Sequence, residues 1–547
     1  MSKKIPIGIS DFKTLIENDY YYVDKTNFIE DISTQVGQTL LFTRPRRFGK
    51  TLNMSMLRYF FDIVNAEENR KLFKDLYIEN TENFKYQGQY PVIFISLKDL
   101  KADNYEILID NFKILISKLY RNYEFLLENI NKYQFSTFEK ILMKSSNLSE
   151  LEDSLLSLME ALYKYYNKKI VLIIDEYDTP LVSAYTNNYY DKAIGLFRNF
   201  FSLALKDNEY LQMGIMTGIL RVAKEGIFSG LNNLAVYTIL DNKYSNFFGL
   251  TENEVKKALI DYQIEYKIDD VKAWYDGYKF GNSEIYNPWS ILNFLASNKL
   301  ESYWINTSDN FLIKKILNNT DDVLIEELTE IFNYQSLEKS IDKSSNMIDL
   351  NNKKEIWQLL LFSGYLTIQN KTETTTDSYL LKIVNKEVHN FFKKTFIDNY
   401  LADESLFAKM MMSLLDKDLK AFEQHLQKIL LLSFSYYDGA KEEKFYHNLI
   451  LGMILYLDRR YKVHSNNEIG FGRYDIVLEP KNSNDIAYIF EFKVAKSSEE
   501  LERKVNEALE QIKDKKYDVD LKEKGYNILN IGMAFFGKEV KVKYKED

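Results

Sequence analysis

The first 235 residues alternate short apolar runs with longer amphipathic stretches. The apolar runs have the length and content of buried strands, and they span residues 39–43, 91–97, 169–174 and 211–217. In the stretches between them, apolar residues recur at helical spacing over residues 103–133, 148–167 and 189–206. Strands that alternate with helices indicate a parallel sheet that is covered by helices on both faces. The pattern therefore predicts an α/β domain over residues 1–235.

The middle of the chain is predicted to form two smaller parts. Residues 236–330 have a helical pattern, and Thr251 with Glu254 three residues later is a capping-box signal for a helix start. Residues 331–435 contain a helix, two short strands and a second helix. That order suits a winged-helix-like connector.

Residues 436–547 are predicted to form a compact α/β end domain. A helix over Phe445–Leu457 comes first, and a long helix over Ser498–Lys513 comes last. Between them lie two strands that are joined by the polar turn Glu479–Asp485, which is the pattern of a hairpin.

Composition and charge exclude several kinds of site. The 547 residues include no Cys and four widely spaced His, which excludes disulfides and Cys-ligated metals and argues against a His-based metal cage. A net charge of −9 excludes a protein that is held to nucleic acid by bulk positive charge, so any such contact must be local. The apolar runs are shorter than the ~18 residues of a membrane span, and the first residues lack a signal-peptide pattern. We therefore expect a cytoplasmic protein with no membrane partner.

The first predicted strand runs into a segment that has the features of a phosphate loop. Such a loop needs backbone N–H groups, a Lys for the β- and γ-phosphates and a hydroxyl for Mg²⁺, and Gly49-Lys50-Thr51 supplies them before a predicted helix. Arg44 stands where the first Gly of this motif is usual, and we expect the three arginines of the loop to supply charge to the polyphosphate. The candidate nucleotide-binding residues are Arg44, Pro45, Arg46, Arg47, Phe48, Gly49, Lys50 and Thr51.

The third predicted strand ends in two acids that complete this site. Asp175 is placed to hold Mg²⁺ together with Thr51, and Glu176 is placed to polarise an attacking water. Thr217 ends the fourth strand at a position suited to sensing the γ-phosphate. Arg221 follows within a turn, and it either contacts the nucleotide or forms a surface salt bridge. The alternative is a chance Gly-Lys-Thr and two strand-capping acids, but the combination favours a site for ATP and Mg²⁺.

The hairpin of the end domain carries a second set of charged residues. If its turn centres on residue 483, Asp475 lies opposite Glu491, while Lys493 shares a face with Glu491. Opposed acids repel each other unless a cation lies between them, which predicts that both ligate Mg²⁺, or alternatively Mn²⁺. Lys493 would then orient a water or neutralise charge, with support from Gln511 and Glu443. The alternative is an amphipathic hairpin with solvated acids.

Several motifs occur together along the chain, namely Gly8–Phe12, Tyr22–Thr26, Arg44–Thr51, Asp175–Asp178, Thr217–Ile219, Trp274–Tyr278 and Tyr286–Trp289. Together they resemble bacterial AAA-ATPase-like proteins with a C-terminal PD-(D/E)XK nuclease domain. The resemblance implies a P-loop ATPase core of the additional-strand catalytic-Glu type, a helical lid over residues 236–330, a connector and a restriction-endonuclease-like domain. It also implies nucleotide and Mg²⁺ roles for Lys50, Thr51, Asp175 and Glu176, and a nuclease core of Asp475, Glu491 and Lys493.

Three functional hypotheses follow. In the first, ATP binding or hydrolysis moves the lid and gates a Mg²⁺-dependent nuclease that acts on DNA rather than RNA, in phage defence or mobile-element biology by family analogy. In the second, the chain is a nucleotide-switched scaffold whose nuclease-like domain is inactive and whose oligomeric state changes with ATP. In the third, the nuclease is an RNA-cleaving effector. A homo-oligomer is compatible with each of them.

Overall fold

The computed structural model describes residues 3–35, 38–221, 233–304, 322–332, 335–342, 353–371, 377–400, 404–433, 456–457, 460–465, 468–469, 472–473 and 475–546. The chain forms two compact units. The first comprises Met1–Ser308, Lys339–Tyr379 and Val384–Glu387, and the second comprises Asp309–Glu338, Leu380–Ile383 and Val388–Asp547. Within the described ranges, no helix is long and apolar enough to cross a membrane.

A five-stranded parallel sheet forms the centre of the first unit. Its strand order is β2-β3-β4-β1-β5, and every neighbouring pair is parallel. The strands are β1 (Thr39–Thr43), β2 (Val92–Ser96), β3 (Ile170–Asp175), β4 (Leu211–Gly218) and β5 (Leu234–Tyr237). Four of them confirm the strands predicted from the apolar runs, whereas the short and partly exposed β5 was not predicted. Since β4 lies between β1 and β3, the sheet has the additional strand that the resemblance implied.

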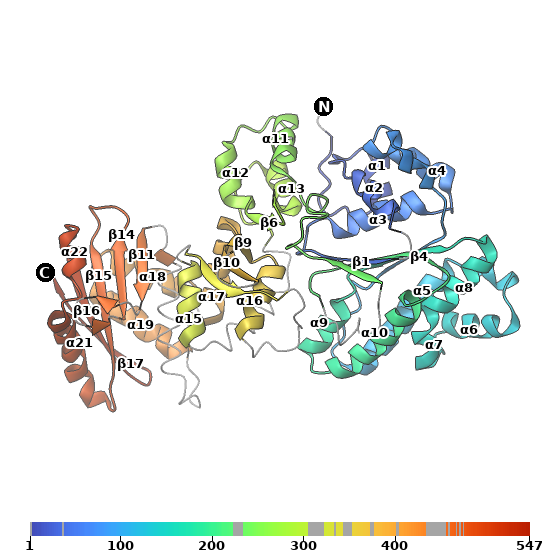
Figure 1. Cartoon of the computed structure of the whole chain (residues 1–547). Helices are drawn as coiled ribbons and strands as arrows, with labels where there is room; N and C mark the ends of the chain where they lie inside the picture. The colour runs from blue at the N-terminus through green and yellow to red at the C-terminus, as the bar shows by residue number, and fades with distance from the viewer. Residues whose placement is uncertain are drawn as a thin grey trace. The chain divides into compact units, whose positions relative to one another are not determined.

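Helices cover both faces of this sheet, as expected for a parallel sheet (Figure 1). On one face lie α1 (Phe12–Glu17), α2 (Asn27–Ser33), α3 (Lys50–Phe61) and α4 (Ala66–Arg70), followed by η1 (Lys71–Phe73), η2 (Tyr77–Asn80) and η3 (Glu82–Tyr86). On the other face lie α5 (Tyr105–Arg121), η4 (Glu124–Glu128), α6 (Lys132–Leu142), α7 (Leu148–Glu152), α8 (Ser154–Tyr166), α9 (Thr179–Thr186) and α10 (Tyr190–Leu205).

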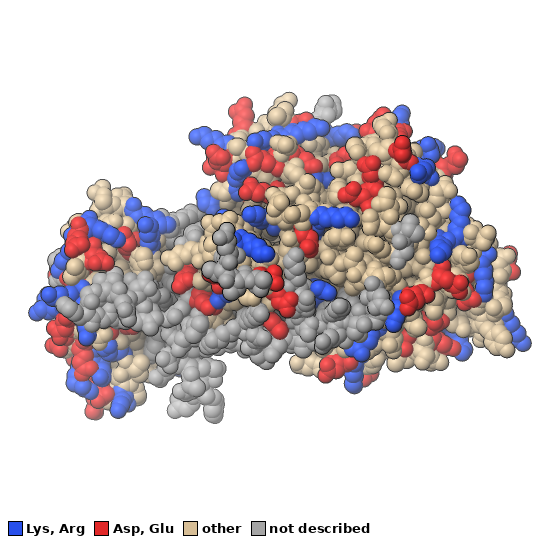
Figure 2. Space-filling model, in the orientation of Figure 1, with Lys and Arg blue, Asp and Glu red and all other residues tan. Residues whose placement is uncertain are grey.

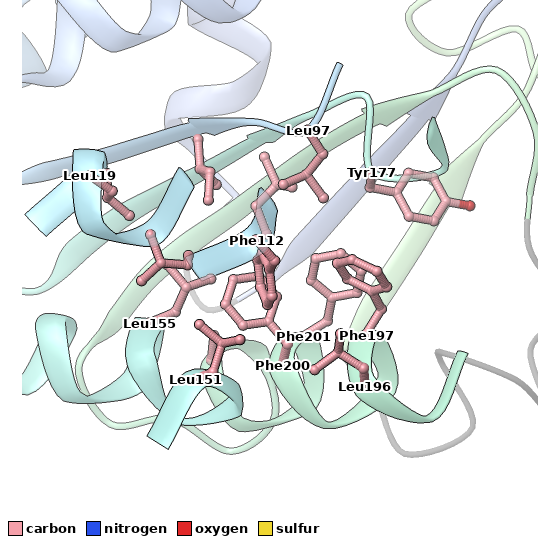
Figure 3. Packing of buried hydrophobic residues seen from close by; sticks show 14 of the residues in the cluster. Leu97, Phe112, Leu119, Leu151, Leu155, Tyr177, Leu196, Phe197, Phe200 and Phe201 are labelled. Carbon is pink, nitrogen blue, oxygen red and sulfur yellow. The ribbon is translucent and has the colours of Figure 1, made fainter. Parts of the chain in front are cut away.

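The second face holds a large apolar core. Figure 3 shows Phe112 of α5 packed against Phe197, Phe200 and Phe201 of α10, with Tyr177 at the edge of the group. The ring centroids of Phe112 and Phe200 lie 4.9 Å apart, within the range of favourable aromatic pairs. This core fixes the strands whose carboxyl ends carry the predicted nucleotide residues.

The predicted lid region is helical, with one small hairpin. It contains α11 (Glu252–Asp261), α12 (Ile268–Tyr275), β6 (Tyr278–Phe280), β7 (Ser283–Ile285) and α13 (Pro288–Ser297). The capping box predicted for α11 is present, and the Thr251 backbone N–H donates to Glu254 at 2.7 Å. Lys25 donates to both oxygens of Glu254, at 2.7 and 2.8 Å. The motif Tyr22–Thr26 is therefore tied to the first lid helix.

The region that includes the predicted helix–strand–strand–helix order also contains one more helix, which overlaps the end of the predicted lid, and one more strand, which was not predicted. It consists of α15 (Asp322–Phe332), β8 (Leu337–Ser340), α16 (Lys353–Phe362), β9 (Leu366–Lys371), β10 (Ser378–Ile383) and α17 (Lys386–Tyr400), with a sheet of order β8-β10-β9. Two more helices follow, α18 (Glu404–Leu415) and α19 (Leu419–Ser433). Glu423 of α19 accepts a hydrogen bond from the backbone N–H of Val542 at 2.7 Å. This contact attaches α19 to the C-terminal sheet, although the sequence assigned residues 331–435 to a connector.

The C-terminal sheet of the second unit is mixed, with strand order β11-β14-β15-β16-β17. β15 and β16 are parallel, and the other neighbours are antiparallel. The elements are β11 (Tyr461–Ser465), β12 (Glu468–Ile469), β13 (Gly472–Arg473), β14 (Ile476–Pro480), β15 (Ala487–Val494), η6 (Ser498–Glu500), α21 (Leu501–Lys515), α22 (Val519–Glu523), β16 (Ile528–Phe536) and β17 (Glu539–Glu546). The hairpin and the long helix were predicted, whereas β16 and β17 were not. Most of the expected helix Phe445–Leu457 lies outside the described residues.

Candidate functional site

The phosphate loop lies between β1 and α3, at the carboxyl end of the sheet. Its backbone is left-handed at Arg47, with φ 68°, and at Gly49, with φ 78°. Arg44 is not among the residues with positive φ, so the position where a Gly is usual does not require one here. The Arg47 conformation costs free energy, which is typical of loops that position a ligand.

Lys50 is buried inside this loop, and its side chain is 4% exposed. Its ammonium group donates to the carbonyls of Arg44 at 3.0 Å and Pro45 at 2.9 Å. Burial lowers the pKa of Lys50, and the nearby acids Glu176, Asp178 and Asp175 oppose that shift. The loop therefore holds a cation close to the acids at the strand ends.

Asp175 connects three of these strand ends through its buried carboxylate. It accepts hydrogen bonds from the hydroxyls of Thr51 at 2.8 Å and Thr217 at 2.5 Å. Ser96, at the end of β2, donates to the same carboxylate at 3.4 Å. Burial raises the pKa of Asp175, and the bonds from Thr217 and Thr51 lower it. The structure thus brings together Thr51, Asp175 and Thr217 as predicted, and it adds Ser96.

Glu176 follows directly in a left-handed conformation with φ 53°. Its backbone N–H donates to the Thr217 hydroxyl at 3.3 Å, and its carboxylate accepts from Thr179 at 3.4 Å. A non-glycine residue in this conformation is strained, and such strain concentrates at functional sites. The arrangement turns Glu176 out of the strand next to Asp175.

Tyr177 and Asp178 hold the chain segment that follows Thr217. The Asp178 carboxylate is 1% exposed and accepts from the backbone N–H groups of Ile219 and Leu220, at 2.8 and 2.9 Å. The Tyr177 hydroxyl donates to the Leu220 carbonyl at 2.8 Å, and Figure 3 shows it directed away from the apolar core. Both residues belong to the motif Asp175–Asp178, but no role was predicted for them. The segment leads to Arg221, the last described residue before 222–232.

Arg44 does not face the phosphate loop's ligand side, which corrects the expectation that it supplies charge to a polyphosphate. Its guanidinium is fully buried and donates to the carbonyls of Thr43, Tyr237 and Tyr244, at 2.8, 2.9 and 3.1 Å. Burial lowers its pKa to about 9. The physical reason is that these carbonyls bind both terminal nitrogens of the buried Arg44 guanidinium, so it joins the loop to β5 and the segment after it.

Of the remaining loop residues, Arg46 and Arg47 are at least partly exposed, whereas Phe48 is buried. Arg47 is exposed, and its guanidinium lies 4.2 Å from the ring centroid of Trp289. Arg46 is partly exposed, whereas Phe48 is buried against Tyr278, with ring centroids 4.8 Å apart. Arg46 and Arg47 therefore remain the candidate phosphate-binding arginines.

The second candidate site lies on the hairpin of β14 and β15. Ile476 pairs with Phe490 and Val477 with Ile489, a register that places Asp475 opposite Glu491. This is the register predicted from a turn centred on residue 483. The Asp475 carboxylate accepts from the backbone N–H of Phe492 at 2.6 Å.

Glu491 is 2% exposed and lies among apolar strands. One carboxylate oxygen accepts from the Lys493 ammonium at 2.9 Å, whereas the other is buried and has no hydrogen-bond partner among the described residues. Burial and the charge of Asp475 raise the pKa of Glu491 to about 7, although the bond from Lys493 opposes this shift. A buried carboxylate oxygen without a partner is unfavourable, and a divalent cation would satisfy it.

Gln511 of α21 donates to the Tyr517 hydroxyl at 3.3 Å. Tyr517 is 1% exposed, and burial and the charges of Glu491 and Asp475 raise its pKa. Gln511 thus contacts Tyr517, a residue that was not predicted and whose pKa responds to the charges of both acids. Glu443, the other expected supporting residue, lies outside the described residues. No cluster of three or more Asp, Glu, His or Cys that could hold a metal occurs in the described part of the chain.

Comparison with known proteins gives matches towards both ends of the chain. Residues 6–228 match the AAA-ATPase-like family, described as predicted AAA-ATPase. Residues 441–545 match the PD-(D/E)XK nuclease superfamily. The chain is also similar to an uncharacterized protein in the vnfD 5′ region of Azotobacter chroococcum mcd 1, with 26% identity over 97% of this chain and 96% of the relative. The two family matches confirm the architecture expected from the resemblance.

Proposed function

We propose that this protein, in which an AAA-ATPase-like domain precedes a PD-(D/E)XK nuclease domain, hydrolyses ATP and couples it to Mg²⁺-dependent hydrolysis of DNA. The observation that carries the proposal is that each of the two domains brings its own predicted set of site residues together in space. Thr51 contacts Asp175 in one domain, and Asp475 lies opposite Glu491 in the other. On family analogy alone, we propose phage defence or mobile-element biology as its setting.

The ATPase part of the proposal assigns a task to each strand-end residue. Lys50 would exchange the carbonyls of its own loop for phosphate oxygens, and the start of α3 would present backbone N–H groups to them. Glu176 would orient the attacking water and accept its proton. Thr217 contacts Asp175 and Glu176, which suits a residue that senses the γ-phosphate.

The nuclease part assigns Glu491 and Asp475 as metal ligands and Lys493 as the group beside the attacking water. The Lys493 ammonium donates a hydrogen bond to Glu491, which keeps it beside the proposed metal ligands. There it would neutralise negative charge that develops on the scissile phosphate. Gln511 and Tyr517 would fix the site from the helix side. Figure 2 shows Lys and Arg interspersed with Asp and Glu over the face in view, which supports local rather than bulk contacts with DNA.

Oxygen donors suit Mg²⁺ at both positions. Thr51 and Asp175 would hold it beside the nucleotide, and Asp475 and Glu491 would hold Mg²⁺, or Mn²⁺, beside the scissile phosphate. The partnerless buried oxygen of Glu491 supports this assignment. Such an ion supplies charge neutralisation and a more acidic bound water.

Cleavage of plasmid DNA, single-stranded DNA and RNA, with Mg²⁺ or Mn²⁺ and with or without ATP, tests the proposal. Asp475→Asn should abolish cleavage, whereas Asp520→Asn, an exposed acid on α22 of the same domain, should leave it unchanged. Thermal unfolding of each variant separates loss of activity from loss of folding. Loss of cleavage in Lys50→Ala as well would mean an ATP-gated nuclease, whereas retention would mean two independent sites.

Two outcomes would replace the proposal. Cleavage of RNA alone would make the protein an RNA-cleaving effector. If the wild type cleaves nothing under any condition, the nucleotide-switched scaffold becomes the better hypothesis. Size-exclusion chromatography with and without ATP would then show whether the oligomeric state changes.

A further inference from the structure

The segment Arg44–Phe48 of the phosphate loop contacts the lid and the region after it along its whole length. The partners are Tyr244, Phe248 and Phe280 for Arg44, the turn at Gly364 for Pro45, Trp304 for Arg46, Trp289 for Arg47, and Tyr278 and Phe280 for Phe48.

Two tryptophans contact Arg46 and Arg47, the two candidate phosphate-binding arginines. The indole N–H of Trp304 donates to the Arg46 carbonyl at 3.3 Å. The ring of Trp289 lies under the Arg47 guanidinium, and a cation over an indole face is attracted to it. The Trp289 indole N–H also donates to the Tyr303 carbonyl at 3.1 Å. The two tryptophans therefore belong to one bonded group.

A single buried carboxylate, that of Glu387, organises this group. One of its oxygens accepts from the backbone N–H groups of Tyr303 and Trp304, the latter at 2.7 Å. The other oxygen accepts from the Ser290 hydroxyl at 2.7 Å, one residue after Trp289. Glu387 is fully buried, and these three donors lie on the segments that carry the two tryptophans. A buried carboxylate that lacks a cation is costly, so its bonds to these segments are what stabilise it there.

We propose that Glu387 is a positioning residue of the nucleotide site, which holds Trp304 and Trp289 against the phosphate loop. Through them it fixes the backbone at Arg46 and the guanidinium of Arg47. The inference rests on the proposed nucleotide site and adds a residue 337 positions beyond Lys50 in the chain. Glu387 is the second residue of α17, so this bonded group connects the phosphate loop to the start of that helix.

The test is the affinity for a fluorescent ATP analogue, measured well below the unfolding temperature of every variant. Glu387→Ala should weaken binding by at least about tenfold, since a small misplacement of positioning groups has effects of this size. Glu387→Gln keeps an acceptor for the N–H groups and should bind within about threefold of wild type. Asp62→Asn, a change at a partly buried acid directly after the carboxyl end of α3, is the matched control and should not alter affinity.

A double-mutant cycle distinguishes positioning from general stability. Trp304→Phe retains a ring next to Tyr365 but loses the bond to Arg46, so it should weaken binding, and adding Glu387→Ala should weaken it little further. If Glu387→Ala fails to fold, wild-type affinity in Trp304→Phe would overturn the inference. Equal affinity of wild type and Glu387→Ala would overturn it while leaving the proposed function intact. Absence of nucleotide binding by the wild type would overturn both this inference and the proposed ATPase function.

Discussion

The hydroxyl of Thr51 donates a 2.8 Å hydrogen bond to the carboxylate of Asp175, although 124 positions separate the two residues in the chain. Thr51 is the second residue of α3, and Asp175 is the last residue of β3. The contact joins the helix after the phosphate loop to the strand that carries both acids. It unites the two groups that we propose as Mg²⁺ ligands.

The Thr51 hydroxyl should be required for Mg²⁺-dependent nucleotide binding. Thr51→Val keeps the shape of the side chain but removes the oxygen, so affinity for Mg²⁺ and ATP should fall by at least about tenfold, or ~1.4 kcal/mol. Thr51→Ser retains the hydroxyl and should bind as wild type does. Titration calorimetry with and without Mg²⁺ measures the ATP affinity of both variants. Equal affinities for the Val and Ser variants would exclude the assigned role.

Glu176→Gln should separate nucleotide binding from hydrolysis. The amide cannot accept a proton from water, so ATP hydrolysis should fall by about 10²–10⁴-fold while ATP affinity stays unchanged. Glu209→Gln alters an exposed acid before the amino end of β4, away from the site, and should hydrolyse ATP normally. Phosphate release and nucleotide affinity are the two measurements. A Gln variant with wild-type turnover would show that another group activates the water.

Local sequence pattern was sufficient to predict much of both sites. The alternation of apolar residues about a polar turn fixed the pairing of Asp475 with Glu491, because side chains on strands repeat every two residues. The strand–loop–helix order around Lys50 likewise follows from neighbouring residues. In both cases the information lies within about 20 residues of the site, a range over which strand and helix geometry is predictable.

Residues that act through packing could not be predicted in the same way. Nothing next to Ser96 in the sequence shows that β2 pairs with β3, which brings its hydroxyl to Asp175. From the sequence alone, Arg44 is predicted to bind phosphate. Its carbonyl partners lie on β5 and the segment after it, which are distant in the sequence. Glu387 is likewise one acid in a helical pattern, and its role depends on tryptophans about 80–100 positions earlier.

The pH dependence of stability should report the burial of Glu387. Burial raises the pKa of Glu387 from its ordinary 4.5 to about 7. Between these values the folded chain holds a proton that the unfolded chain has lost, so the contribution of Glu387 to stability falls as pH rises. The free energy of unfolding of wild type, relative to Glu387→Gln, should therefore fall by up to about 3 kcal/mol between pH 4.5 and 7.5.

Denaturant titrations of the two proteins at several pH values measure this difference. Other titrating groups affect both proteins alike and cancel. The tyrosines whose pKa the Glu387 charge raises, Tyr275, Tyr278 and Tyr303, remain protonated throughout. A difference that does not change with pH would show that Glu387 is ionised in both states over this range.

Gly218 should be required for the close packing of the segment after Thr217. A Cβ at this position would lie 2.6 Å from the Tyr177 ring and 2.8 Å from the Asp178 carboxylate, and both side chains are buried. Gly218→Ala should therefore lower the free energy of unfolding by roughly 1–3 kcal/mol and reduce ATP hydrolysis more than binding, since Thr217 adjoins Glu176. Gly195→Ala on α10 meets nothing within 4 Å and should be neutral or stabilising. Chemical denaturation of both variants decides the matter, because equal stability of Gly218→Ala and wild type would mean that Tyr177 and Asp178 do not hold this segment rigidly.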